Sequence, residues 1–238
     1  MSASTPLKSM FESVPRRYDL LNRLLTLGFD ERWRRAAVES CLHDRPARVL
    51  DLCCGTGDLV ARLARDAPPE TVVVGLDFSP QMLEHARRKL EQTAAGRQVE
   101  LIEGNAARMP FADGEFDSVG IAFGFRNLTW RNPLRDAALA EVHRVLRPGG
   151  RFVIAETGQP RWGALRAGYH AFMAAAVAPL GGWISGERGA YRYLAGSARG
   201  FYGATAVSEM LREAGFEGIE ARSLLGGVAA LHVATRGV

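Results

Sequence analysis

Short apolar runs alternate with longer mixed segments through the middle of the chain. The apolar runs predict β-strands at 48–53, 71–76, 99–103, 116–123 and 151–156. The segments between them predict helices near 58–66, 80–92 and 133–146, and Arg147-Pro148-Gly149-Gly150 predicts a stop before the fifth strand. Strands that alternate with helices are typical of a parallel sheet covered on both faces, so the predicted fold class is α/β.

The N-terminal part and residues 160–200 depart from this alternation. Apolar residues near helical spacing predict a helix over 11–27, and a second helix follows at 31–42. Residues 160–200 hold many aromatic and apolar side chains punctuated by glycines. This stretch is longer than a strand–helix connection needs, so we expect an inserted helical cap.

The C-terminal part predicts a different ending for the sheet. A helix near 205–214 is followed by two apolar runs, 219–225 and 228–235. The pair Gly226-Gly227 separates these runs and favours a hairpin. We therefore expect a mostly parallel sheet of seven strands that ends in an antiparallel hairpin.

A glycine-rich turn follows the first predicted strand and carries the main chemical signal. Gly55 and Gly57 permit a sharp turn and a close backbone approach that a Cβ would block. Asp77 ends the second strand 20 residues after Gly57, where an acid can accept hydrogen bonds from ribose hydroxyls. This strand–turn–helix–strand–acid unit predicts a pocket for a nucleoside cofactor.

Two features of the turn narrow the choice of nucleoside. Dinucleotide-binding turns carry a third glycine three residues after the second, but Val60 stands there. Asp51 and Asp58 flank the turn with negative charge, which suits a cation better than a phosphate. S-adenosylmethionine (SAM) has a sulfonium, an amino group and no phosphate, so it is the expected cofactor. A nicotinamide-dependent oxidoreductase is the alternative from another class of enzyme.

The composition of the chain limits its possible partners, the roles of its cysteines and its location, but it indicates no further chemistry. The chain has 238 residues, a hydrophobic fraction of 47% and a net charge of +4 with its arginines scattered, so we expect no nucleic-acid partner. Cys41, Cys53 and Cys54 fit neither a metal site nor a disulfide framework, and Cys53 and Cys54 are expected to pack near the turn. The sequence predicts no signal peptide and no membrane span, so a cytoplasmic enzyme is expected.

The motifs resemble those of the C-methyltransferases of ubiquinone and menaquinone biosynthesis, which are class I SAM-dependent methyltransferases with a Rossmann-like fold. The matching segments are 17–22, 49–58, 75–80, 105–111, 122–127, 141–150 and 226–232. The most specific are Phe123-Gly124-Phe125-Arg126-Asn127 and Gly226-Gly227-Val228-Ala229-Ala230-Leu231-His232. The resemblance implies one domain over 1–238: N-terminal helices (1–45), a nucleoside-binding core (46–158), a helical substrate cap (159–204) and a C-terminal helix and hairpin (205–238).

The resemblance, with the turn, implies a set of cofactor-binding positions. These are Tyr18, Asp51, Gly55, Thr56, Gly57, Asp77, Phe78, Asn105 and Ala106. Asn105 and Ala106 follow the third strand and are expected to border the adenine, whereas Tyr18 either closes over the cofactor or is a plain core aromatic. Many family members have a serine at the position of Ala122, so that contact is lost here or moves to the backbone.

The implied reaction is methylation of a ring carbon in a demethylated prenyl quinol, a precursor of menaquinone or ubiquinone. The predicted catalytic residues are Arg126, which would orient a base or water relay and stabilise a phenolate, and Asn127, which would hold the loop or a substrate oxygen. The alternative for Arg126 is an ion pair that anchors the cap. Glu156 is a weaker candidate base, and His143 and His232 are expected to be structural.

A substrate with a prenyl tail also affects which partners, including a membrane, we expect for this protein. The apolar side chains of 160–184 suit a polyprenyl tail or, equally, the cap's own core. A prenyl tail implies transient contact with the inner face of a membrane, and a homodimer stays open. Because the cap segments 185–190 and 200–203 are atypical of the family, a methyltransferase for another small-molecule or natural-product acceptor is the alternative, and a non-catalytic SAM-binding module is a further one.

Overall fold

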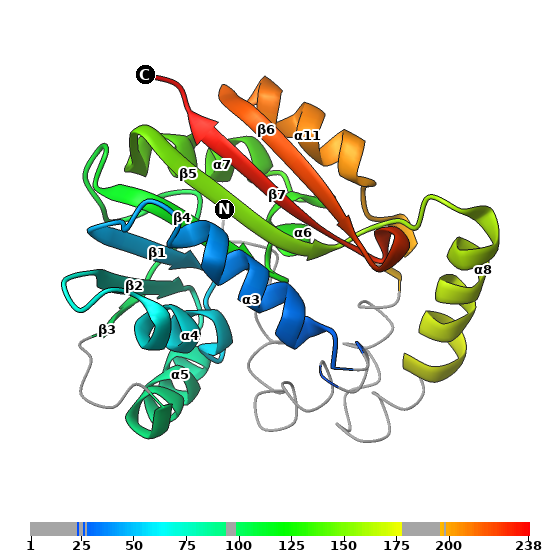
Figure 1. Ribbon diagram of the computed structural model, residues 1–238, viewed down its shortest axis with the longest axis horizontal. Coiled ribbons are helices and arrows are strands. Elements are labelled where there is room, and N and C mark those ends of the chain that lie inside the picture. Colours follow the sequence, from blue (N-terminus) through cyan, green and yellow to red (C-terminus); the bar gives the residue numbers. More distant parts are fainter. Residues whose placement is uncertain (1–22, 24–25, 27, 94–98, 178–195, 198) are drawn as a thin grey trace.

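The computed structural model is built on one seven-stranded sheet with helices on both faces (Figure 1). It describes residues 23, 26, 28–93, 99–177, 196–197 and 199–238. The strands are β1 (Arg48–Leu52), β2 (Val72–Asp77), β3 (Val99–Glu103), β4 (Phe116–Ala122), β5 (Leu146–Thr157), β6 (Phe216–Leu224) and β7 (Ala229–Arg236). The α-helices are α3 (Asp30–Cys41), α4 (Asp58–Asp66), α5 (Pro80–Thr93), α6 (Phe125–Thr129), α7 (Arg135–Val145), α8 (Gly163–Phe172) and α11 (Ala204–Glu213). A π-helix, η1 (Met173–Val177), and a 3₁₀ turn, η2 (Leu225–Gly227), complete the described elements.

The strand order β3-β2-β1-β4-β5-β7-β6 determines where a ligand can bind. The first five strands are parallel, and β7 pairs antiparallel with both β5 and β6. The direction of strand progression reverses between β1 and β4. In open α/β sheets the crevice at the carboxyl ends of the strands next to such a reversal is the usual ligand site.

Two hydrophobic clusters hold the helices against the sheet. In β1, Leu50 and Leu52 belong to one cluster and Val49 to the other, as the two-residue period of a strand requires. The cluster of Leu50 also contains residues of α7 and α11, and the cluster of Val49 contains residues of α3, α4 and α5. Full burial of one such side chain stabilises the fold by about 1.5–3 kcal/mol. The inner strands β1, β2 and β4 are mostly apolar because both of their faces are covered, whereas β6 at the edge of the sheet is largely exposed.

The predicted elements agree closely with the structure, with two differences. The predicted helix stop is confirmed, since α7 ends at Val145, but the predicted start of the fifth strand at 151 is wrong: β5 begins at Leu146, and its pairing with β4 shifts register between Phe116 and Ser118. A bulge lets an edge of a strand accommodate proline and glycine without ending it. The short helix α6 was not predicted, because five residues are too few to display a helical period.

The predicted C-terminal hairpin is confirmed. It reverses through η2, where Gly226 and Gly227 have φ angles of 65° and 98°. These values lie in the left-handed region that favours glycine. The predicted helix over 11–27 falls outside the described residues apart from Arg23 and Thr26, and residues 178–195 and 198 of the predicted cap also lie outside them.

Candidate active site

The glycine turn after β1 is held by the acid that ends β2. One carboxylate oxygen of Asp77 accepts a hydrogen bond from the backbone N–H of Gly55 at 2.9 Å, and the other accepts from the N–H of Ser79 at 3.0 Å. Asp77 is 5% exposed. Burial raises the pKa of Asp77, although the N–H groups of Ser79 and Gly55 act against the rise. The turn and the acid predicted to form one pocket are therefore in direct contact.

The backbone of the turn adopts conformations that only a few residues tolerate. Gly55 and Gly57 have φ angles of 53° and 88°, and the non-glycine Cys53 has a φ of 56°. Such strained non-glycine residues concentrate at functional sites. A Cβ on Gly57 would lie 2.9 Å from the Cβ of Ala86 in α5. The second glycine is thus required by its backbone conformation and by the approach of a neighbouring helix.

Asp51 gives the turn a buried carboxyl oxygen without a hydrogen-bond partner among the described residues. Its side chain lies at the end of β1 and is 1% exposed, and the oxygen in question is Oδ2. Burial raises the pKa of Asp51 well above its ordinary value, and the nearby charge of Asp77 raises it further. A buried carboxylate oxygen of this kind is stabilised by a cation. The residues of the turn therefore fit a group that carries an ammonium or sulfonium, such as SAM.

The other predicted cofactor-binding positions lie around the same carboxyl edge. Thr56 is buried within the turn, and Phe78 is half-buried just after β2. Asn105 follows β3, and its side-chain oxygen accepts a hydrogen bond from the N–H of Ala107 at 2.9 Å. Ala106 is 7% exposed. Tyr18 lies outside the described residues.

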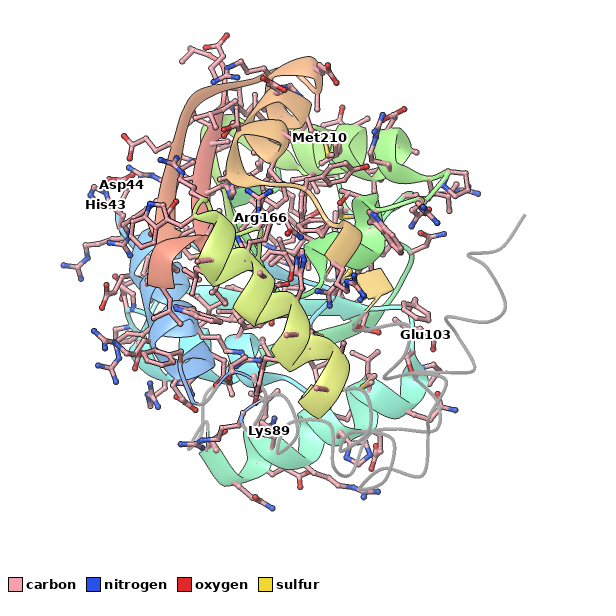
Figure 2. The ribbon with its side chains drawn as sticks, turned by 90° about the vertical axis from the view of Figure 1, so that its right-hand side faces the viewer. His43, Asp44, Lys89, Glu103, Arg166 and Met210 are labelled. Atoms are coloured by element: carbon pink, nitrogen blue, oxygen red, sulfur yellow. The ribbon has the colours of Figure 1, made fainter. Side chains whose placement is uncertain are left out.

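Next to this edge lies a cavity of about 380 Å³. Its floor comes from the carboxyl ends of β4 and β5, where Phe123, Arg126 and Thr157 line it. Its walls are mostly apolar and come from α3, α8, η1 and the β6–β7 turn: Trp33, Leu165, Phe172, Met173, Leu225 and Val228. Figure 2, which labels Arg166 on α8, shows this helix crossing in front of the sheet. The described part of the predicted cap therefore forms one wall of the cavity.

Arg126 is one of two buried arginines that line this cavity, the other being Arg34. It is 5% exposed, its backbone N–H donates to Glu156 Oε2 at 3.0 Å, and its Nη1 donates to Thr157 Oγ1 at 2.8 Å. Nη1 also lies 3.9 Å from Glu156 Oε1. The Nε of Arg126 is buried and has no hydrogen-bond partner among the described residues. An arginine held this way keeps its charge at the pocket wall.

The model of the ubiE/COQ5 methyltransferase family matches residues 1–236. The chain belongs to the ubiE/COQ5 methyltransferase family. The resemblance inferred from the motifs is thereby confirmed.

Relatives within the ubiE/COQ5 family match along nearly the whole chain. A demethylmenaquinone methyltransferase of Thermus thermophilus is 47% identical over 95% of this chain and 100% of its own. A ubiquinone/menaquinone biosynthesis C-methyltransferase UbiE of Geobacter sp. is 37% identical over 97% of this chain and 96% of its own. Among solved structures, a SAM-dependent methyltransferase of Thermotoga maritima superposes with a TM-score of 0.66 at 19% identity, covering 97% and 99% of the two chains. That likeness confirms the predicted Rossmann-like fold.

For this member of the ubiE/COQ5 family, the two predicted catalytic residues differ in position. Arg126 lines the cavity, whereas Asn127 is not among its lining residues. The backbone oxygen of Asn127 accepts a hydrogen bond from the side chain of Asn132 at 2.9 Å. This bond uses the backbone oxygen of Asn127 and not its side chain, so both roles expected for Asn127 stay predictions.

The histidines and cysteines occupy structural positions. His143 packs edge-on against Phe216 with ring centroids 5.3 Å apart. His232 lies in β7, and its Nε2 is 3.1 Å from the backbone oxygen of Ala204. The pKa values of all three cysteine thiols are raised, chiefly by burial.

The sequence reasoning missed an ion network that joins α3 to the glycine turn. Arg34 pairs with Asp30 four residues earlier, and its Nη2 lies 3.3 Å from Asp58 Oδ2 at the start of α4. Its guanidinium also lies 4.8 Å from the ring centroid of Phe123. Burial acts to raise the pKa of Asp58, but Arg34 and Lys89 outweigh it, so the pKa lies below the ordinary value.

The Asp30–Arg34 spacing was the available sign of this network, because residues four apart share one face of a helix. The spacing predicts the pair on α3 but not its contact with the glycine turn. Arg34 therefore links the N-terminal helix, the turn and the cavity wall at Phe123.

Proposed function

We propose that this protein transfers a methyl group from SAM to a ring carbon of a demethylated prenyl quinol, with demethylmenaquinol as the acceptor. The observation that carries the proposal is the buried Arg126 in the wall of an otherwise mostly apolar cavity at the carboxyl ends of β4 and β5. Such a cavity suits a flat apolar ring whose one reactive oxygen needs a positive partner. The 47% identical relative, whose name specifies demethylmenaquinone, favours that acceptor over a ubiquinone precursor.

The cofactor would lie along the carboxyl edge from β4 to β3. Asp77 would accept hydrogen bonds from the ribose hydroxyls, since each carboxylate oxygen that binds a backbone N–H keeps a second lone pair. Asn105 and Ala106 would border the adenine. The unpartnered Oδ2 of Asp51 would receive the amino group, directly or through water. Bound SAM supplies an activated methyl electrophile.

The remaining work of the site is to align the ring and exclude water. An aromatic carbon becomes a strong nucleophile when the neighbouring hydroxyl loses its proton. Arg126 would stabilise the resulting phenolate because it keeps its charge at any physiological pH. The apolar walls of the cavity strengthen that interaction by excluding solvent.

The test is a methylation assay with SAM and three acceptors: demethylmenaquinol, the demethylated ubiquinol precursor and a small phenol without a prenyl tail. We expect methylated menaquinol as the main product. Arg126→Lys should lower kcat by about 100-fold or more, as the loss of one oriented transition-state donor does, with unchanged SAM affinity. Arg131→Lys is the matched control, because Arg131 stacks on Trp130 and does not line the cavity. Intact SAM binding without methylation of any quinol would overturn the proposal.

The mouth of the cavity supports transient contact with a membrane. Trp162 is 70% exposed and Leu225 49% exposed. A Cβ on Gly226 would lie 3.6 Å from the Trp162 ring, so the start of α8 and the β6–β7 turn lie side by side, as Figure 1 also shows. Arg161 and Arg166 are exposed beside Trp162. An exposed tryptophan flanked by arginines is suited to an anionic bilayer surface.

We expect this rim, Trp162 and Leu225 with the two arginines, to meet the membrane while the prenyl tail enters. No helix in the described ranges is long and apolar enough to cross a bilayer. Sedimentation with vesicles of anionic and of neutral lipid tests the expectation. Trp162→Ala and Arg161→Gln should each weaken binding to anionic vesicles, whereas Arg87→Gln on α5 should not. Equal binding by all variants would refute this surface.

A further inference from the structure

Behind the wall of the main cavity lies a second, much smaller one. It has a volume of about 10 Å³, which is about the room that one water molecule needs. Its polar lining comes from Glu156, Thr157, Tyr202 and His232. Thr157 lines both cavities, so a single side chain separates them at this point.

His232 brings an unsatisfied acceptor to the small cavity. The residue is 2% exposed, and its Nε2 lies 3.1 Å from the carbonyl oxygen of Ala204. A carbonyl can only accept, so Nε2 carries the hydrogen and Nδ1 of the neutral ring presents a lone pair. Nδ1 is buried and has no partner among the described residues. Burial lowers the pKa of His232, which keeps the ring neutral.

Strand register puts Glu156 on the same face of the sheet as His232. Glu156 pairs with Ala230 and Ile154 pairs with His232 in the antiparallel β5–β7 ladder. Glu156 and His232 are therefore diagonal neighbours, a distance that one water molecule can bridge. A water in the small cavity would donate to Nδ1 of His232 and face the carboxylate of Glu156.

A hydrogen-bonded chain continues from Glu156 to the main cavity. The hydroxyl of Thr157 accepts from Nη1 of Arg126 at 2.8 Å and donates to Oε1 of Glu156 at 2.9 Å. Because Arg126 can only donate, the direction of both bonds is determined. The Thr157 hydroxyl is therefore an oriented link between the site of the quinol and the buried carboxylate.

We propose that Thr157, Glu156, one buried water and His232 form the path by which the substrate proton leaves the reacting ring. The inference rests on the proposed function. The quinol O–H bond breaks and its proton moves to Thr157 Oγ1, which passes its own hydrogen to Glu156 Oε1. Glu156 and His232 act through Thr157 and do not contact the substrate, so they are positioning residues.

The electrons and atoms balance over the complete reaction. The oxygen electron pair enters the ring, the ring carbon bonds to the methyl carbon, and the methyl–sulfur bond breaks with its pair going to sulfur. The ring carbon then loses its hydrogen as a proton, which the ring oxygen takes up, so that the aromatic ring and the hydroxyl are both restored. The proton from the original O–H bond is held on the path, shared through the water with His232, and returns through Thr157 to solvent once the product has left the main cavity.

An imidazole is a suitable end for this path. Its ordinary pKa of about 6.5 is closer than that of a carboxylic acid to the value of about 10 for a phenol. The titratable groups around His232 are Glu156 from β5 and Tyr202 before α11, and Arg126 lies behind Glu156. From β6 and α11 the neighbours are the uncharged Ala221, Ala204 and Val207.

The decisive variants change the link without changing the charge. Thr157→Val removes the hydroxyl, and Thr157→Ser keeps it. We expect Thr157→Val to lower kcat about 100-fold, in the range of general acid–base catalysis, with SAM affinity within twofold, and Thr157→Ser to restore most of the rate. Thr129→Val is the matched control, because the Thr129 hydroxyl is buried and, among the residues that the structure describes, bonds only to Phe125 O within α6.

The pH profile of kcat tests the far end of the path. Protonated His232 cannot accept, so the wild-type rate should fall as pH drops below the lowered pKa of His232, which lies under its ordinary value of 6.5. His232→Gln should abolish that acid limb. Wild-type kcat in Thr157→Val, or an unchanged acid limb in His232→Gln, would overturn the path. Wild-type enzyme that methylates no quinol would instead count against the proposed function, so the two failures are distinguishable.

Discussion

Gly57→Ala should destabilise this protein through two separate effects. Gly57 has a φ of 88°, a left-handed conformation that costs a residue with a Cβ about 1–2 kcal/mol. Its new Cβ would lie 2.9 Å from the Cβ and 3.0 Å from the Cα of Ala86. Ala86 is fully buried in α5, and overpacking such a contact costs about 1–3 kcal/mol more. The expected loss of unfolding free energy is therefore about 2–5 kcal/mol.

Gly149→Ala is the control that separates the two effects. Gly149 has a φ of 73°, in the same conformational region, but a Cβ there would meet nothing within 4 Å. It should therefore lose only the conformational part, about 1–2 kcal/mol. Since 1 kcal/mol shifts the Tm of a domain of this size by about 2–4 °C, we expect a fall of about 2–8 °C for Gly149→Ala and about 4–20 °C for Gly57→Ala.

The assay is thermal unfolding without cofactor, repeated in urea to obtain free energies. Combining Gly57→Ala with Ala86→Gly removes the 2.9 Å contact. The unfolding free energy lost by the double variant should therefore be smaller, by at least about 0.5 kcal/mol, than the two single losses added together. This is the low end of the coupling energy between touching residues, which is about 0.5–3 kcal/mol. If Gly57→Ala is no more destabilising than Gly149→Ala, the close approach of α5 to the turn does not constrain this position and the reasoning is refuted.

Three further predictions concern charge and burial. SAM affinity should rise as pH increases through the raised pKa of Asp51, because a bound cation favours the ionised carboxylate. Calorimetry in two buffers should detect the proton that Asp51 releases on binding, and Asp51→Asn should remove the pH dependence. Arg34→Met leaves Asp30 buried without its ion-pair partner, with only the hydroxyl of Thr26 still donating to it, and should cost about 3–5 kcal/mol in urea unfolding; a loss below about 1 kcal/mol would contradict a buried pair. Cys41, whose pKa burial raises to about 12, should resist iodoacetamide in the native state and react once unfolded, as read by mass spectrometry.

Local patterns were sufficient to predict most of the fold. The α4 helix has the predicted bounds, 58–66, and four of the first five strands agree to within a residue at each end. Apolar runs and paired glycines act over a few neighbouring residues, so they are visible in the sequence. The unpredicted continuation of β5 through Pro148 depends on pairing with β4, a partner about 30 residues away.

The candidate site also has features that local sequence patterns predict and features that depend on contacts between distant residues. The glycine turn with Asp77 indicated a nucleoside pocket, and its acids indicated a cation, because both lie within one strand–turn–helix–strand unit. The motif with Arg126 indicated the family. None of these patterns could show that Arg34 reaches Asp58, since the two residues come from different helices.

The sequence by itself determined the fold class, the cofactor pocket and the family of this protein. Only the tertiary structure decided which side chains meet: that Asp51 keeps an unpartnered oxygen, that Arg126 and Thr157 share a cavity, and that Glu156 and His232 lie diagonally across two strands. The physical reason is distance along the chain. Hydrophobic period and turn chemistry are local, whereas burial, pairing and proton paths depend on residues that only the folded sheet brings together.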